Sequence, residues 1–371
     1  MIYLDSAATS FHKPKSVKYA VVDALESMSS PGRGAYGYAM RAADKVYECR
    51  EKIAELFNVD NPENVVFTSN ATHALNIAIR SLADKGDRVI VSGYEHNSVT
   101  RVLNHIGADW TAVQTPLFDK DKAIKGFKKN LSGAKLAVCN HVSNVFGYEL
   151  PVEEIAKLCH EADVPFIIDA SQSAGVKNID FAVLNAEFIA MPGHKGLMGP
   201  QGTGILLCKN EVEPIMFGGT GSASAEQFMP DFLPDRLEAG THNVPGIAGL
   251  AAGVQYVLDY GADNIGKHEK YLCKLMAEIL KENNDMEVFQ SENDMQAGVL
   301  SVRHKNIDPE ILCAELGNRG VAARCGLHCA PLAHETAGTI DTGTVRFSFS
   351  PFATREEVEK ACKELEKVIN M

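Results

Sequence analysis

Residues 187–208 read EFIAMPGHKGLMGPQGTGILLC: a β-rich run, a glycine-flanked loop that carries Lys195, and a second β-rich run. A lone lysine in a loop is ordinarily a solvated charge. Here Gly193 and Gly196 would let a cofactor approach the backbone closely, and a pocket that lowers the lysine pKa would make its amine a nucleophile. Lys195 is therefore a candidate for a lysine that holds a carbonyl cofactor covalently, with a solvated loop residue as the alternative.

Around this loop, helical patterns alternate with short β-rich runs from about residue 16 to residue 210. The spacing of apolar residues predicts amphipathic helices over 17–28 and 42–59. The predicted buried strands are 64–69, 87–93, 135–142, 165–171, 187–191 and 203–208. This alternation predicts an α/β fold with a mostly parallel central sheet, in which ligands gather at the carboxyl ends of the strands.

The pattern changes to glycine- and proline-rich loops over residues 211–245. The elements expected after it are helices within 246–283, strands over 298–304 and 344–350, and a terminal helix over 355–369. We expect a large domain over residues 15–255, and a smaller α+β domain made of residues 1–14 with 256–371.

Charge and composition exclude several classes of protein. The 371-residue chain has a formal net charge of −12 and no basic run, which argues against binding nucleic acid or an anionic membrane. Its first residues, MIYLDSAATS, do not resemble a signal peptide, and no run of about 18 apolar residues could span a bilayer. The nine cysteines, an odd number, indicate free thiols in a reducing compartment, and we expect a cytoplasmic protein. Cys139 and Cys159 lie in apolar patterns typical of core residues.

Polar residues follow several of the predicted strands. Asp169 ends the run PFIIDASQSAG, where a carboxylate could keep the pyridine nitrogen of pyridoxal 5′-phosphate (PLP) protonated; a helix N-cap is the alternative. The segment SNATHALN joins a strand to a helix, whose free N–H groups would bind phosphate, or whose polar residues are ordinary caps. His96 follows a strand in SGYEHNSV, as a site residue or as a structural loop histidine.

Together these motifs resemble the class V PLP-dependent aminotransferase-fold enzymes, and within them the cysteine desulfurases of the SufS-like branch. The resemblance runs from YLDSAAT to TVRFSFSPF, nearly the whole chain. It implies a PLP-dependent transferase fold of the aspartate aminotransferase type (fold type I), with PLP as the cofactor. By this resemblance Lys195 binds PLP covalently, Asp169 pairs with the pyridine nitrogen, Gln172 bonds the phenolic oxygen and His96 stacks on the ring.

The same resemblance assigns further residues. It implies that Ala71, Thr72 and His194 bind the phosphate and that Asn144 lies near cofactor and substrate. Thr241 matches a threonine that reaches the phosphate of the partner subunit, which implies a homodimer.

The segment 322–352, AARCGLHCAPLAHETAGTIDTGTVRFSFSPF, resembles the part of cysteine desulfurases that ends in His-Cys-Ala and leads into a strand. By that match Cys329 is the nucleophile, and Arg346 takes the substrate carboxylate through its two-pronged guanidinium. Arg324 and His328 could make the surroundings of the thiol electropositive. The alternative for Cys329 is a buried loop thiol.

Some positions depart from the family pattern. Gly32 and Tyr36 stand where the SufS-like branch often has histidines, and Pro192 stands where a small residue is usual. Cys325 has three possible roles: a packing residue, a resolving thiol or a second sulfur carrier. The positions that could suggest a zinc site are Cys325, His328, Cys329 and His334. Their spacing is looser than that of structural zinc sites, so we expect no metal.

The resemblance implies an enzyme that takes sulfur from L-cysteine, leaving L-alanine and a persulfide on Cys329. A selenocysteine lyase would use the same parts. Another class V activity (aminotransferase, epimerase or β-eliminating lyase) would not need Cys329, and a non-catalytic PLP-binding or regulatory protein is the third alternative. The expected partners are L-cysteine or L-selenocysteine and a sulfur-acceptor protein.

Overall fold

The computed structural model describes residues 1–32, 34–210 and 212–370. A seven-stranded sheet forms its centre, in the order β2-β8-β7-β6-β5-β3-β4. These strands are β2 (Val65–Thr68), β3 (Arg88–Ser92), β4 (Asp109–Val113), β5 (Leu136–Asn140), β6 (Phe166–Asp169), β7 (Phe188–Pro192) and β8 (Gly204–Cys208). Strands β3 to β7 run parallel, whereas β8 is antiparallel to both β7 and β2. The mostly parallel sheet and six of its strands are therefore confirmed; β4 was not predicted.

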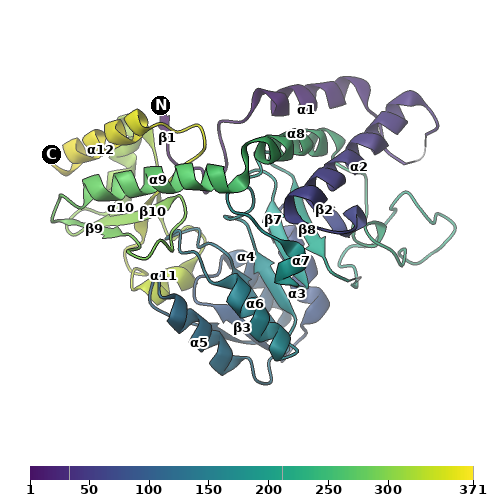
Figure 1. Cartoon of the computed structure of the whole chain (residues 1–371), viewed down its shortest axis with the longest axis horizontal. Coiled ribbons are helices and arrows are strands. Elements are labelled where there is room, and N and C mark those ends of the chain that lie inside the picture. The colour runs from purple at the N-terminus through teal and green to yellow at the C-terminus, as the bar shows by residue number, and fades with distance from the viewer. Residues whose placement is uncertain (33, 211, 371) are drawn as a thin grey trace.

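Helices cover both faces of this sheet (Figure 1). They are α2 (Gly37–Phe57), α3 (Ala71–Leu82), α4 (Asn97–Ile106), α5 (Lys120–Asn130), α6 (Val152–Glu161), α7 (Phe181–Leu184) and α8 (Val244–Tyr260). Helix α1 (Lys15–Ser27) packs on α8, outside this layer. A separate hydrophobic core forms on each face of the sheet. Strand β5 contributes to both, because successive side chains of a strand point to opposite faces. Ala137 and Cys139 pack with α2, α6 and α8, and Leu136 and Val138 pack with α3 and α4.

The C-terminal part builds a four-stranded antiparallel sheet in the order β12-β13-β10-β9. Its strands are β9 (Met286–Phe289), β10 (Val299–His304), β12 (Arg324–Gly326) and β13 (Thr344–Ser348). Its helices are α9 (Ala262–Leu280), α10 (Pro309–Asn318), α11 (Pro331–Ala337) and α12 (Arg355–Ile369). The chain start joins this part, because β1 (Ile2–Tyr3) pairs in parallel with β11 (Val321–Ala322).

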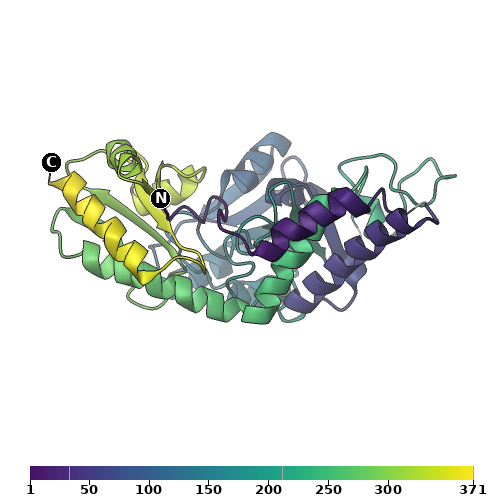
Figure 2. The same cartoon turned by 90° about the horizontal axis from the view of Figure 1, so that it is seen from above.

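Helix α9 leads from α8 to the C-terminal part, where it packs on the four-stranded sheet beside α12 (Figures 1 and 2). The predicted helical stretch 246–283 is in fact two helices that meet at Gly261, whose φ of 82° suits glycine. The loops over 211–245 contain one short 3₁₀ turn, Asp235–Leu237, in their described part. Within the described residues, no helix has the length and apolar character that crossing a membrane would require.

Candidate active site

A cavity of about 220 Å³ opens where β3, β5, β6 and β7 end, facing the C-terminal sheet. Its lining includes these residues singled out from the sequence: Ala71, Thr72, His96, Asn144, Asp169, Gln172, His194, Lys195, Cys329 and Arg346. Thr241 is the exception: it is exposed and does not line the cavity of its own chain. The fold therefore brings all but one of the predicted site residues to one place.

Lys195 lies in the loop between β7 and β8 and is partly exposed. Burial lowers the pKa of its amine to about 8; the nearby Asp169 acts in the opposite direction, and the positive charge of Arg346 adds to the lowering. A larger fraction of uncharged amine is therefore available near neutral pH than an ordinary lysine offers.

The glycines beside Lys195 also serve a purpose that was not predicted. A Cβ on Gly193 would lie 2.2 Å from Thr203 Oγ1, and a Cβ on Gly196 would lie 2.3 Å from the Ala174 carbonyl oxygen. They are needed because the loop packs tightly on the protein's own chain, a requirement that adds to the predicted close approach of a cofactor.

Asp169 is the last residue of β6 and is buried. Its Oδ1 accepts a hydrogen bond from the Ser171 backbone N–H at 2.9 Å. The next helix, α7, begins only at Phe181 and is capped by Asp180. The N-cap alternative for Asp169 is therefore wrong, and its carboxylate faces the cavity.

The amino end of α3 also borders the cavity. Asn70 is its N-cap and accepts from the His73 N–H at 2.9 Å. The amides of Ala71 and Thr72 belong to the first turn, whose N–H groups have no acceptor within a helix. They can therefore donate to an anion, with the helix dipole favouring its negative charge.

His96 caps α4 and lines the cavity, so it has a structural role and faces the site as well. Its Nδ1 accepts from the Ser98 N–H at 3.0 Å, which places the proton of the neutral ring on Nε2. Burial lowers the pKa of His96 to about 4, so the ring is uncharged at neutral pH. Ser98 Oγ lies 2.9 Å from that Nδ1 and 2.8 Å from Thr72 Oγ1, and thereby links the two elements. Ser98 was missed from the sequence; a serine two residues after a histidine at a strand-to-helix junction was the available signal.

Arg346 on β13 is almost fully buried, at 2% exposure. Its Nη2 pairs with Asp5 Oδ1 at 2.7 Å and its Nη1 donates to the Asn144 carbonyl at 2.9 Å. Asp5, which was not predicted, thus holds the guanidinium from the chain start. Arg346 Nε and Asn144 Oδ1 are buried without a hydrogen-bond partner in the described part of the chain.

Cys329 lies at the cavity between β12 and α11, and of the nine cysteines it alone is exposed. Its carbonyl accepts from the Asn97 N–H at 2.8 Å, and the His328 carbonyl accepts from Asn144 Nδ2 at 2.8 Å. His328 and Cys329 both have left-handed φ angles, 50° and 57°. The thiol is therefore presented by a short loop that is hydrogen-bonded to the start of α4 and to the loop after β5.

The predicted electropositive contribution of His328 is wrong. The ring is buried, and burial together with the neighbouring Arg346 charge lowers its pKa to about 2. An imidazole with that pKa is uncharged. Of the two residues expected to supply positive charge, Arg324 remains, which is exposed and lines the same cavity as Cys329.

Cys325 points away from the cavity. It neighbours Arg324 in β12, and successive strand residues face opposite sides. Its side chain packs against the core of the C-terminal sheet, beside Cys313 of α10. Burial raises the pKa of the Cys313 thiol to about 12, and the Cys325 thiol adds to that rise. Of the three roles considered, the packing role fits Cys325.

The structure also places the other residues that the sequence singled out. Cys139 and Cys159 are buried, as predicted. Among the described residues no three histidine, cysteine or acidic side chains come together in a way that could hold a metal ion. Pro192 ends β7 and lines the cavity. Gly32 and Tyr36 do not line it, and Arg33 between them lies outside the described residues.

A model of the family "Aminotransferase class-V" matches residues 2–361. The chain belongs to the aminotransferase class-V family. Two curated relatives in this family are probable cysteine desulfurases, from Pyrococcus abyssi (33% identical) and Methanothermobacter thermautotrophicus (32% identical). The alignments cover 100% of this chain, and 94% and 95% of those proteins. The apo structure of a cysteine desulfurase from Thermococcus onnurineus NA1 has a TM-score of 0.91 and is 31% identical, covering 100% of this chain and 94% of that one. The fold type I assignment is thereby confirmed.

Class-V aminotransferases depend on PLP, and the residues present fit that cofactor. The cavity joins a lysine of lowered pKa, a buried carboxylate and a helix amino end, which are the partners that the carbonyl, the pyridine nitrogen and the phosphate need. The unpartnered Asn144 Oδ1 and Arg346 Nε add two buried polar atoms on the cavity wall. An apolar ligand would leave all these groups unsatisfied.

Proposed function

We propose that the protein is a PLP-dependent cysteine desulfurase, which converts L-cysteine to L-alanine and leaves the sulfur as a persulfide on Cys329. One observation carries the proposal: the only exposed cysteine of the chain lines the same cavity as Lys195. An aminotransferase or epimerase of this family would have no use for a thiol there.

When bound, PLP supplies an electron sink for the bonds at the substrate α-carbon. Lys195 would hold it covalently, with Asp169 at the pyridine nitrogen, Gln172 at the phenolic oxygen and His96 against the ring. The first-turn amides of Ala71 and Thr72, together with His194, would bind the phosphate.

The chain's own residues account for the remaining tasks. Arg346 and Asn144 would orient the substrate carboxylate, since the guanidinium is fixed by Asp5 and retains unpaired donors. Lys195 would take the α-proton at Nζ, because its lowered pKa makes the free amine available.

Cys329 Sγ would then attack the substrate sulfur, so that an S–S bond forms as the Cβ–S bond breaks. Cysteine and the enzyme thiol give alanine and the enzyme persulfide, and the atoms and electrons balance without an added oxidant or reductant. The exposed position of Cys329 leaves the persulfide accessible to a sulfur-acceptor protein.

Three further features belong to the proposal. Thr241 is exposed and away from the cavity of its own chain, which supports a homodimer in which it serves the partner's phosphate. The division into residues 15–255 and residues 1–14 with 256–371 is supported by the pairing of β1 with β11. We place the protein in the cytoplasm because its cysteines are free thiols.

The test is the formation of alanine from L-cysteine, compared between the wild type and Cys329→Ser with PLP bound to both. We expect the wild type to form alanine and the variant to lose sulfur transfer while keeping PLP. Alanine formation at the wild-type rate by Cys329→Ser would refute the proposal. Turnover of selenocysteine alone would favour the selenocysteine lyase alternative.

A further inference from the structure

A second, smaller cavity of about 30 Å³ adjoins the first at the lysine loop. The two share Ala7, Ser171, Gln172 and Lys195 in their linings, so the lysine borders both. The far wall of the small cavity includes Glu269 of α9. Because one water needs about 10–15 Å³ of such volume, the cavity has room for about two.

Glu269 is a buried acid that the proposed mechanism does not use. It is 8% exposed, and burial is the only influence on its pKa, with no hydrogen bond or neighbouring charge from the described residues contributing. Burial raises the pKa of Glu269 well above its usual range, which favours the protonated, uncharged carboxyl. The titratable groups near it are Lys195, which lines the same cavity, and Tyr256 of α8, whose own pKa is raised by burial, by Tyr260 and by Glu269.

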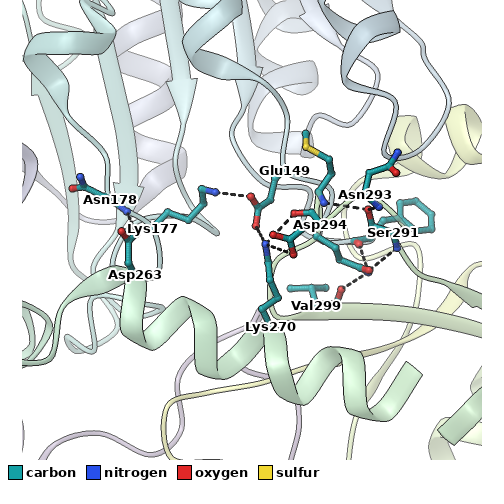
Figure 3. Close-up of polar contacts among 12 residues, drawn as sticks. Glu149, Lys177, Asn178, Asp263, Lys270, Ser291, Asn293, Asp294 and Val299 are labelled. Atoms are coloured by element: carbon teal, nitrogen blue, oxygen red, sulfur yellow. Dashed lines mark hydrogen bonds and ion pairs between the residues drawn. The ribbon is translucent and has the colours of Figure 1, made fainter. Parts of the chain in front are cut away.

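The lysine next to Glu269 in the sequence pairs with other carboxylates (Figure 3). Lys270, the next residue of α9, pairs with Glu149 at 3.3 Å and with Asp294 at 3.2 Å. Glu149 is also paired with Lys177 at 2.5 Å, and Asp263 of α9 accepts from the Asn178 N–H at 2.9 Å. These contacts fix α9 against loops of the large sheet and, through Asp294, against the loop between β9 and β10. They engage the Lys270 ammonium with carboxylates other than Glu269.

Gly298, on the wall of the small cavity opposite α9, leaves space for the Glu269 side chain. A Cβ on Gly298 would lie 2.5 Å from Glu269 Cβ and 3.1 Å from its Oε2. The residues around Gly298 are pinned by Gln296, whose Nε2 donates to the carbonyls of Phe146, Phe289 and Val299 at 2.9 to 3.0 Å. An unpartnered buried carboxyl destabilises a fold, so a cavity built to contain one indicates a use for it.

We propose that Glu269 is the proton-exchange partner of Lys195, acting through water held in the small cavity. This inference rests on the proposed function, in which Lys195 Nζ takes the substrate α-proton. A neutral carboxyl suits the task because one oxygen accepts a proton while the other donates one. The ammonium of Lys195 gives a proton to one water, which passes a proton to Glu269, and the Glu269 hydroxyl returns a different proton through a second water. One N–H bond breaks and another forms, with no net change in charge.

The experiment uses L-cysteine deuterated at its α-carbon, in ordinary water, with the deuterium in the product alanine measured by mass spectrometry. Without exchange, one deuteron among the three hydrogens of the Lys195 ammonium allows about one-third retention. We expect wild type to retain far less than that, and Glu269→Gln, which keeps the shape but not the acidic proton, to rise toward one-third. Lys270→Gln, which disturbs the ion pairs but not the cavity, should retain as little deuterium as wild type.

Equal deuterium retention in wild type and Glu269→Gln, with alanine formed by both, would overturn the role of Glu269 and leave the proposed function intact. Absence of alanine in wild type would instead refute the proposed function. The protonation state of Glu269 can be measured without any enzyme turnover. The infrared spectrum of the PLP-free protein should contain a band of a protonated carboxyl, and Glu269→Gln should remove that band. If that band is the same in both proteins, Glu269 is ionised and the exchange pathway does not exist. Thermal unfolding checks that Glu269→Gln is folded, since removing an unpartnered acid should leave the melting temperature unchanged or higher.

Discussion

Replacement of Asp5 by alanine tests how Arg346 is held. The guanidinium is 2% exposed, and within residues 1–32, 34–210 and 212–370 its one ion pair is with Asp5 Oδ1 at 2.7 Å. In Asp5→Ala its remaining hydrogen-bond acceptor is the Asn144 carbonyl at 2.9 Å. Breaking a buried ion pair from one side costs about 3–5 kcal/mol, because the other charge stays buried. The Asp5 side chain is 19% exposed, so water can partly replace it, and we expect a loss of about 3 kcal/mol.

The assay is denaturant unfolding of the PLP-free protein, followed by steady-state kinetics of the PLP-loaded one. Asp5→Ala should lower the free energy of unfolding and raise KM for cysteine more than it lowers kcat, since Arg346 loses its orientation before any bond changes. The matched control is Glu359→Ala, which removes the exposed partner of Arg355 and should leave both quantities unchanged. A loss below about 0.5 kcal/mol in Asp5→Ala, with KM unchanged, would refute the view that this pair fixes the arginine.

Three further predictions concern Cys325, His328 and Lys195. Cys325→Ser should keep most of the activity, because its side chain faces the core of the C-terminal sheet; loss of sulfur transfer with PLP retained would contradict the packing role. His328→Gln should change the rate at which iodoacetamide alkylates Cys329 by less than about twofold, because an imidazole with a pKa of about 2 carries no charge to lose. Covalent attachment of PLP to the PLP-free protein should speed up about tenfold per pH unit below a pKa of about 8 and then level off, since only the free amine of Lys195 reacts. A rate that keeps rising to the usual lysine pKa of 10.5 would show that burial does not lower this one.

The core strands could be predicted because they are continuous apolar runs. Strands β5, β6, β7 and β8 are buried at every residue, as expected of strands covered on both faces. Strand β4 was missed because it lies at the sheet edge, with exposed residues among its five. The three-residue β12 was too short, and its glycine too unfavourable to a strand, to be recognised.

Site residues could be predicted where a polar residue ends a strand, as Asp169 does, or lies in the short loop after one, as His96 does. Contacts between distant segments could not: Asp5 and Arg346 are 341 residues apart, and Glu269 meets the lysine loop only through the placement of α9. The charge state of His328 also escaped prediction, because burial rather than sequence neighbourhood decides it. Sequence proximity to Cys329 was therefore a poor guide to what surrounds the thiol.

The most direct test of the central claim is the location of sulfur on the enzyme after brief exposure to L-cysteine. Mass spectrometry of peptides from the PLP-loaded protein should find one added sulfur on Cys329, none on Cys325, and one alanine released for each persulfide formed. Sulfur on Cys325 with Cys329 unmodified, or alanine released with no persulfide on any cysteine, would contradict the account.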